Sequence, residues 1–242
     1  SFYLTSKISL ARDFIIFNKI CKMKSVKTIT IIAVLQFTAV FAFAQKTISE
    51  GTMIYDIVIQ SGNKEPQIAD ALDGGTITTY IKGGQSRSDM VSALGKETTI
   101  HDTKAGNAVI LKEYSGQKLM ITLTKANWEA KNKAYDNIKF EFIDETKIVA
   151  GYNCKKAIAS MPGGKSIVVY YAPDLIITNK EYNSTFKSLP GLALQYEYES
   201  GAMKYKYTLS KINFDPIPAS KFDFPKSGYR VMTYEENQKM RK

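Results

Sequence analysis

The clearest pattern along the chain is an alternation of apolar and polar residues with a period of two. In residues 51–60, Met53, Tyr55 and Ile57 fall on one side and Asp56 on the other. This period is typical of half-buried β-strands. Related patterns predict seven further strands, at residues 76–82, 108–114, 118–124, 138–143, 166–172, 192–198 and 203–212.

Glycine-containing turns separate these segments, at residues 74–75, 83–84, 105–107, 115–116, 162–164 and 200–201. Many short strands joined by tight turns predict a large antiparallel meander. Helical spacing is confined to residues 125–137, where alanines recur every four positions, and residues 65–72. With no internal repeat or linker, the pattern predicts a single β-rich domain.

Several predicted strands are apolar or aromatic on both faces, as in residues 167–172 (IVVYYA) and 192–199 (LALQYEYE). Such a strand needs cover on each side, from a second layer, a helix or a bound apolar ligand. The chain is 44% hydrophobic and contains 15 tyrosines, whose rings can be buried while their hydroxyls reach water. This composition excludes a disordered chain and favours a core built on sheet surfaces.

The first 44 residues have a different pattern. A short basic stretch begins at Met23, residues 28–43 are mainly apolar, and Ala42-Phe43-Ala44 precedes Gln45. This order is that of a secretory signal peptide, so we predict that residues 23–44 are removed by cleavage between Ala44 and Gln45. The apolar run is shorter than the roughly 20 residues of a membrane span, and no lipobox marks its end. We expect residues 1–22 to be a non-native upstream segment, and residues 45–242 to form the exported domain, in the periplasm or outside the cell.

The charge of the predicted mature domain is modest. The formal net charge of the chain is +10, but residues 45–242 contain 27 basic and 22 acidic residues, which leaves +5. The basic residues are scattered and form no block suited to a phosphate backbone, so we expect no nucleic-acid partner. Cys21 lies before the predicted cleavage site, so Cys154 has no partner for an intramolecular disulfide and apolar burial must supply the stability.

Candidate catalytic groups are few. The single histidine, His101, stands beside Asp102, but adjacent side chains on a strand point to opposite faces and make no dyad. We interpret His101 as a structural residue on a polar turn. Cys154 has lysine neighbours that could lower its thiol pKa, yet a free cysteine is usually a small buried residue. No catalytic, metal-binding or cofactor-binding residues are predicted, and no cofactor.

Other chemical signatures are weak. The carboxylates follow no recognisable spacing, so a glycosidase pair is neither proposed nor excluded. No Gly-x-Ser-x-Gly elbow marks a nucleophilic serine. Residues 162–166 (PGGKS) lack the spacing of a phosphate-binding loop and are interpreted as a hairpin turn.

Residues 146–198 carry a series of motifs that resembles a known family. They are, in order, residues 146–148 (TKI), 151–157 (GYNCKKA), 170–175 (YYAPDL) and 188–193 (SLPGLA). The series resembles the secreted envelope proteins of unknown function marked by a GLPGLI signature, and the related domain of unknown function 4412. Ser188 and Ala193 depart from the first Gly and last Ile of the signature. Residues 80–87, ending in Arg87, are similar to an early strand-turn element of the family, and residues 217–226 to the end of the lipoprotein-carrier (LolA/LolB) class.

The resemblance implies a half-open barrel made from one curved antiparallel sheet, with a few short helices against its concave side. It implies no catalytic residues. The motif residues are expected to be mainly structural: Arg87, Gly151, Tyr152, Cys154, Lys155, Leu189, Pro190 and Gly191.

Three hypotheses for the function follow. The first is a non-enzymatic binding protein for a lipid, a lipoprotein acyl chain or another hydrophobic ligand. The second is a structural or interaction module that meets another protein of the cell envelope. The third is a hydrolase. An apolar pocket of several hundred Å³ would favour the first hypothesis, and a filled interior the second.

Overall fold

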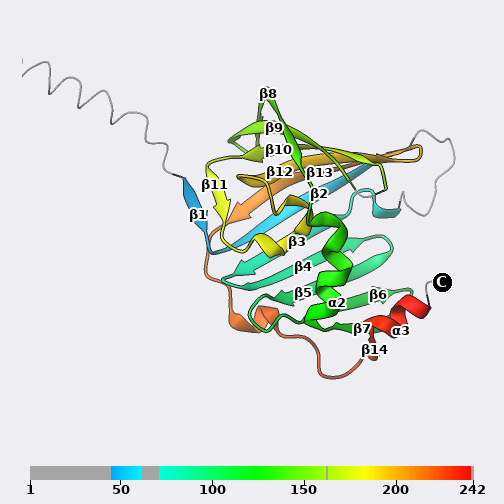
Figure 1. The fold of residues 1–242 in the computed structure, drawn as a ribbon. Coiled ribbons are helices and arrows are strands. Elements are labelled where there is room, and N and C mark those ends of the chain that lie inside the picture. The colour runs from blue at the N-terminus through cyan, green and yellow to red at the C-terminus, as the bar shows by residue number, and fades with distance from the viewer. Residues whose placement is uncertain (1–44, 62–70, 162, 241–242) are drawn as a thin grey trace, which may run out of the picture. The chain divides into compact units, whose positions relative to one another are not determined.

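The computed structural model describes residues 45–61, 71–161 and 163–240. Twelve strands in this part of the chain form one sheet, which Figure 1 shows from the face crossed by α2 (Lys125–Asn132). In order across the sheet they are β14 (Arg230–Thr233), β7 (Gln117–Leu123), β6 (Ala108–Tyr114), β5 (Gly95–Asp102), β4 (Gln85–Ser92), β3 (Thr76–Lys82), β2 (Glu50–Ser61), β13 (Met203–Asn213), β12 (Leu192–Ser200), β10 (Ser166–Ala172), β9 (Tyr152–Ser160) and β8 (Phe140–Val149). Two short strands, β1 (Lys46–Ile48) and β11 (Leu175–Ile177), form a separate parallel pair.

The sheet consists of two antiparallel meanders. Strands β2 to β7 follow one another directly, and β8 to β13 form the second meander with β11 set aside. The two meet where β13 pairs with β2, from Met203 opposite Ser61 to Asn213 opposite Thr52. Register shifts interrupt the pairing of β8, β10 and β13, and such bulges bend and twist a sheet.

The predicted mainly β fold with one large open sheet is confirmed, but the sheet is mixed rather than wholly antiparallel. Strand β14 lies parallel to β7, with Arg230 opposite Leu119 and Thr233 opposite Thr122. A parallel neighbour needs a long crossover. The segment between β13 and β14 supplies it, because this segment runs across the sheet before β14 begins (Figure 1).

Around β6, both faces of the sheet are covered. We call the face under α2 the helix face and the other the C-terminal face. In β6, Ile110 packs on the helix face with the partly buried Trp128 of α2. Val109 and Leu111 point the other way and pack with the partly buried Tyr229, from the segment that precedes β14. The sheet therefore has two covering layers: the short helices on the helix face, and the segment between β13 and β14, called the C-terminal segment, on the C-terminal face.

Strands β4 and β5 were not predicted from the sequence. Their residues, QSRSDMVS and GKETTIHD, contain few apolar side chains and show no clear alternation. Both strands nevertheless lie inside the sheet, and Ser86, Asp89, Thr98 and His101 are buried. Pairing on both sides and the two coverings place these residues in the interior, an effect of tertiary structure that a local pattern cannot show.

The helix predicted at residues 125–137 is present as α2 followed by the 3-10 turn η3 (Lys133–Tyr135). Thr124 and Asn127 form a capping box at its start, which fixes where the helix begins. The covering layer continues with η4 (Lys180–Tyr182) and η5 (Ser184–Phe186). On the C-terminal side lies η6 (Ala219–Phe222), and α3 (Tyr234–Lys239) follows β14.

Several predictions fall wholly or mainly outside the described residues. They are the upstream segment at residues 1–22, the signal peptide at 23–44 and most of the second helix, at 65–72. Gln45, on the far side of the predicted cleavage site, is exposed. Within the described ranges, no helix has the length and apolar character needed to cross a membrane.

Candidate ligand-binding site

The hairpin of β12 and β13 places a row of tyrosines on the helix face. Near the turn, each strand has two tyrosines at alternate positions, and a two-residue turn that contains Gly201 joins the strands. The turn fixes the register, so Tyr196 lies opposite Tyr207 and Tyr198 opposite Tyr205. We call these four residues the tyrosine ladder.

The rings of the tyrosine ladder are stacked. The centroids of Tyr196 and Tyr207 are 4.6 Å apart with an interplanar angle of 11°, and those of Tyr198 and Tyr205 are 5.0 Å apart at 9°. Phe186 of η5 meets Tyr196 edge-on, with centroids 4.8 Å apart. Stacked and edge-on pairs stabilise a sheet surface beyond the area that they bury. The tyrosine ladder therefore forms a continuous aromatic surface whose rings are held in place by one another and by Phe186.

The opposite face of the same hairpin is polar. Glu197 and Glu199 alternate with the tyrosines of β12, and Lys204 and Lys206 with those of β13. Lys204 forms an ion pair with Glu197, its Nζ 2.9 Å from the carboxylate. The hairpin thus separates an aromatic face from a charged face, and only the aromatic face turns toward the covering helices.

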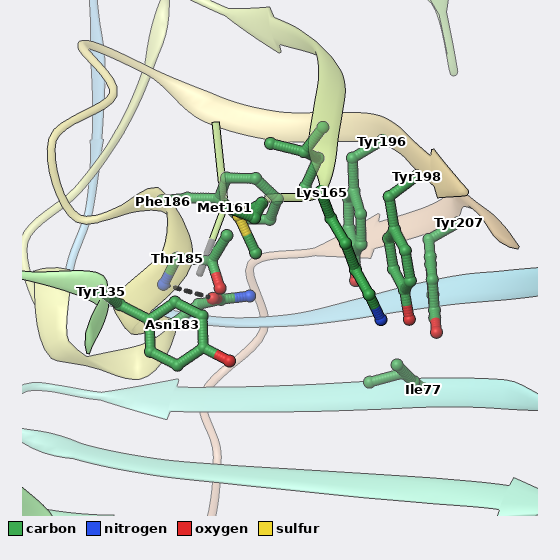
Figure 2. Close-up of a pocket in the computed structure, with 11 residues that line it drawn as sticks. Ile77, Tyr135, Met161, Lys165, Asn183, Thr185, Phe186, Tyr196, Tyr198 and Tyr207 are labelled. Carbon is green, nitrogen blue, oxygen red and sulfur yellow. Dashed lines mark hydrogen bonds between the residues drawn. The ribbon is translucent and has the colours of Figure 1, made fainter. Parts of the chain in front are cut away.

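A pocket of about 340 Å³ lies between the tyrosine ladder and the covering layer (Figure 2). Its walls are mainly apolar and aromatic, with a few polar side chains among them. They are formed by Ile77, Tyr135, Met161, Lys165, Ile167, Asn183, Thr185, Phe186, Tyr196, Tyr198 and Tyr207. These residues come from β3, β10, β12, β13, the turns around η3 and η5, and the turn between β9 and β10, which supplies Met161 and Lys165.

Local hydrogen bonds hold the covering side of the pocket in place. The Asn183 side chain accepts a hydrogen bond from the backbone N–H of Thr185 at 3.1 Å, drawn as a dashed line in Figure 2. This is the cap that starts η5, and it sets the position of Phe186 three residues later. The side chain of Lys165 runs beside Tyr198, and its Nζ lies 5.9 Å from the ring centroid and 2.9 Å from the Ser200 hydroxyl.

Burial keeps two of the pocket tyrosines, Tyr196 and Tyr207, in the neutral form. It raises the pKa of Tyr196 and of Tyr207 well above the usual value of 10, and neighbouring tyrosines add to this shift. Both hydroxyls therefore remain hydrogen-bond donors at every pH at which the protein would work.

Most of the family-motif residues gather at the other end of β9, β10 and β12. Tyr152 and Cys154 belong to a core cluster with Leu192, and Gly151 lies in the turn before β9. Leu189 is buried in a second cluster. Leu189 shares its cluster with Phe186 of the pocket wall, whereas Gly151, Tyr152 and Cys154 do not line the pocket. The predicted structural role of these residues remains a prediction.

The remaining motif residues lie elsewhere. Lys155 and Pro190 line a separate surface pocket of about 470 Å³ near the outer edge of β8. Arg87 lies on β4, where its Nε donates a hydrogen bond to Asp89 at 2.8 Å and its Nη1 one to the carbonyl of Lys221 at 3.0 Å. Neither group of contacts reaches the tyrosine ladder.

The candidate nucleophile and metal ligands do not form a reactive site in the described part of the chain. Cys154 is a free and fully buried thiol, and burial raises its pKa to about 11, so it is neutral and unreactive at neutral pH. Among the described residues, no three His, Cys, Asp or Glu side chains are grouped so that they could hold a metal ion.

The sequence interpretation of His101 as a residue on a polar turn was wrong. His101 lies in β5, opposite Ser86 and Ala108, and is only 4% exposed. Its ring stacks on Trp128 of α2, with centroids 4.1 Å apart and an interplanar angle of 18°. The turn begins two residues later, at Thr103, and α2 covers the histidine, which the local sequence could not reveal.

We expect His101 to make folding sensitive to acid. Burial lowers its pKa below the usual 6.5, against the opposing effect of Glu181 and Asp102. Between the two pKa values, the unfolded chain therefore binds more protons at this residue than the folded protein does. The stability that neutral His101 contributes is present above pH 6.5 and is lost as the pH falls through the pKa of His101 in the folded protein. His101→Phe, which keeps the stack on Trp128, should flatten this dependence. The test compares the melting temperatures of the original protein and the His101→Phe variant from pH 7 to pH 5. If both melting temperatures fall equally with pH, the expected role of His101 is contradicted.

Sequence analysis did not identify the pocket. The ladder tyrosines were recognised only as part of two-sided strands, and Phe186 and Asn183 belong to a segment without periodicity. The one available signal was the repeated tyrosine at alternate positions on both sides of the turn at Gly201. That signal indicates that the rings lie side by side. The pocket forms only because the segment with Asn183 and Phe186 packs over them.

Comparisons with known proteins add little beyond the fold. No family model and no curated protein matches the chain, so membership of the GLPGLI family stays a prediction. Matching solved structures include PNGF-II (14% identity, TM-score 0.49), over 79% of this chain and 33% of that chain. An uncharacterized conserved protein from Thermus thermophilus matches at 8% identity and TM-score 0.45, over 74% and 90%. A LolA superfamily protein from Nitrosomonas europaea matches at 6% identity and TM-score 0.34, over 73% and 90%.

These likenesses concern the fold alone. The Nitrosomonas protein belongs to the class that residues 217–226 resemble, but TM-scores below 0.5 at such identities carry no argument about activity. The chain also spans only about a third of the length of PNGF-II. The functional argument therefore rests on the pocket itself.

Proposed function

We propose that this protein is a non-enzymatic binding protein that holds a hydrophobic or amphipathic ligand, such as a lipid or an acyl chain, in the pocket beside the tyrosine ladder. The observation that supports the proposal is the pocket of about 340 Å³ with aromatic and apolar walls. Small-molecule sites are typically concave, mostly apolar and supplied with a few placed polar groups. We place the protein among exported proteins, in the periplasm or outside the cell, on the basis of the predicted signal peptide.

A neutral fluorescent probe tests this proposal directly. N-phenylnaphthylamine gains fluorescence in apolar sites, and the purified protein should bind it in a saturable way. Met161→Trp places an indole in the pocket wall and should weaken probe binding about tenfold or more, which corresponds to roughly 1.4 kcal/mol. Titrations of the probe at constant protein concentration measure the effect.

The matched control is Val58→Trp. Val58 is 45% exposed on β2 and lies opposite Lys206, on the charged face of the sheet. The same indole there should leave probe binding unchanged. Equal loss in both variants, or no saturable binding by the unmodified protein, would contradict the proposed function.

A protein-interaction role is the second candidate function, and the outer edge of β8 favours it. This edge strand ends the sheet and exposes Phe142 (56%) and Ile148 (70%) on one face. We propose an extended segment of an envelope protein as the partner, because such a segment can pair with a sheet edge and place side chains in pockets beside it. The test is crosslinking of this protein to an envelope protein. The crosslink should form with the original protein and be lost in the double variant Phe142→Lys, Ile148→Lys.

A further inference from the structure

The charged and polar groups of the pocket indicate which kind of ligand it fits. Lys165 is the one charged residue among the described residues that line it, and no Asp or Glu joins them. Glu197 and Glu199 of the β12–β13 hairpin alternate with the ladder tyrosines and so point to the opposite face, whereas Lys165 lies just before β10. The pocket therefore has a positive charge that no lining carboxylate balances.

Several polar groups of the pocket can donate a hydrogen bond. Tyr135, Tyr196, Tyr198 and Tyr207 each bring a hydroxyl, and Figure 2 shows the last three rings side by side, with the Lys165 side chain running beside Tyr198. Burial keeps Tyr196 and Tyr207 protonated, and a protonated hydroxyl can donate to an anion. The Lys165 Nζ donates a hydrogen bond to the neutral Ser200 hydroxyl at 2.9 Å. Lys165 also lines a neighbouring surface pocket with Glu197 and Glu199, but neither glutamate lines the pocket beside the tyrosine ladder.

We propose that the pocket selects an anionic amphiphile, whose apolar part packs on the aromatic wall and whose carboxylate or phosphate group meets Lys165 and the tyrosine hydroxyls. The inference rests on the proposed function and specifies its ligand class. A hydrogen bond between two charged groups is stronger than one between neutral groups. Lys165 is exposed, so solvent reduces the effect.

The test compares two ligands that share a tail and differ in charge. Dodecanoate and dodecanol are each used to displace N-phenylnaphthylamine from the purified protein at neutral pH and low salt. Dodecanoate should bind about three- to tenfold more tightly, and added salt should reduce this preference. Lys165→Met should abolish the preference by weakening dodecanoate alone, whereas Lys165→Arg should keep it.

Lys206→Met is the matched control, because it removes one positive charge from the opposite face of the β12–β13 hairpin, and Lys206 does not line the pocket. It should leave both affinities unchanged. Equal binding of the two ligands, or a Lys165→Met variant that keeps the preference or weakens both ligands alike, would overturn the inference while probe binding still supports the proposed function. Failure of the probe and of both ligands to bind would instead overturn the proposed function itself.

Discussion

Replacing Arg87 by alanine is expected to destabilise the protein by about 3 kcal/mol or more. The guanidinium and the Asp89 carboxylate form a nearly buried ion pair, with side chains that are 16% and 11% exposed. Asp89 also accepts a hydrogen bond from the Thr98 hydroxyl at 2.7 Å, and Lys96 lies 3.7 Å away. Without Arg87 the carboxylate would stay buried with incomplete compensation, and the carbonyl of Lys221 would lose its donor. Denaturant unfolding measures the loss.

Two comparisons separate this effect from a general loss of charge. The double variant Arg87→Met, Asp89→Leu removes both charges and should lie much closer to the original stability, because well-packed apolar residues can replace a buried pair. Lys125→Ala breaks an exposed pair with Glu129, whose side chains are 75% and 64% exposed, and should cost less than about 1 kcal/mol. An Arg87→Ala cost as small as that of Lys125→Ala would contradict the expected role of Arg87 in holding the C-terminal segment on the sheet.

Gly191→Ala is expected to cost about 3 kcal/mol or more, because there is no room for a side chain. A Cβ at this position would overlap the backbone oxygen of Ala172 and press on the backbone of Pro173. Here the start of β12 passes close to the end of β10, so neither neighbour is a flexible side chain that could move aside. Thermal or denaturant unfolding of the variant checks the prediction.

Gly201→Ala provides the contrast. Gly201 has a φ of +62° in the hairpin turn, and a Cβ there would meet nothing within 4 Å. Its replacement should cost only the backbone penalty of about 1–2 kcal/mol. If Gly191→Ala proved no more costly than Gly201→Ala, the predicted structural role of the Leu-Pro-Gly motif would lose its main support.

The strands that could be predicted from the sequence are those whose burial leaves a local trace. In β2, the buried Met53, Tyr55, Ile57 and Ile59 alternate with more exposed residues, because one face of this strand packs inward. The helix at residues 125–132 was predictable for the same reason, since its spacing and its cap are local features. Turn glycines such as Gly201 marked where one strand ends and the next begins, whereas the register of the β12–β13 hairpin was seen only in the structure.

The strands that were missed have no such trace. β4 and β5 are held by pairing on both sides and by coverings that come from distant parts of the chain. The parallel position of β14 depends on the crossover of the C-terminal segment, and no periodicity encodes a crossover. His101 was assigned to the wrong environment because Trp128, which covers it, lies in another element.

The sequence by itself determined the mainly β fold, the glycine turns, the helix at residues 125–132 and the alternate tyrosines of β12 and β13, because each depends on neighbours a few residues away. Only the tertiary structure decided that Phe186 and Asn183 close a pocket over those tyrosines and that Arg87 meets Asp89 beneath the C-terminal segment. These contacts join elements far apart in the chain, and their geometry follows from how the covering segments pack on the sheet.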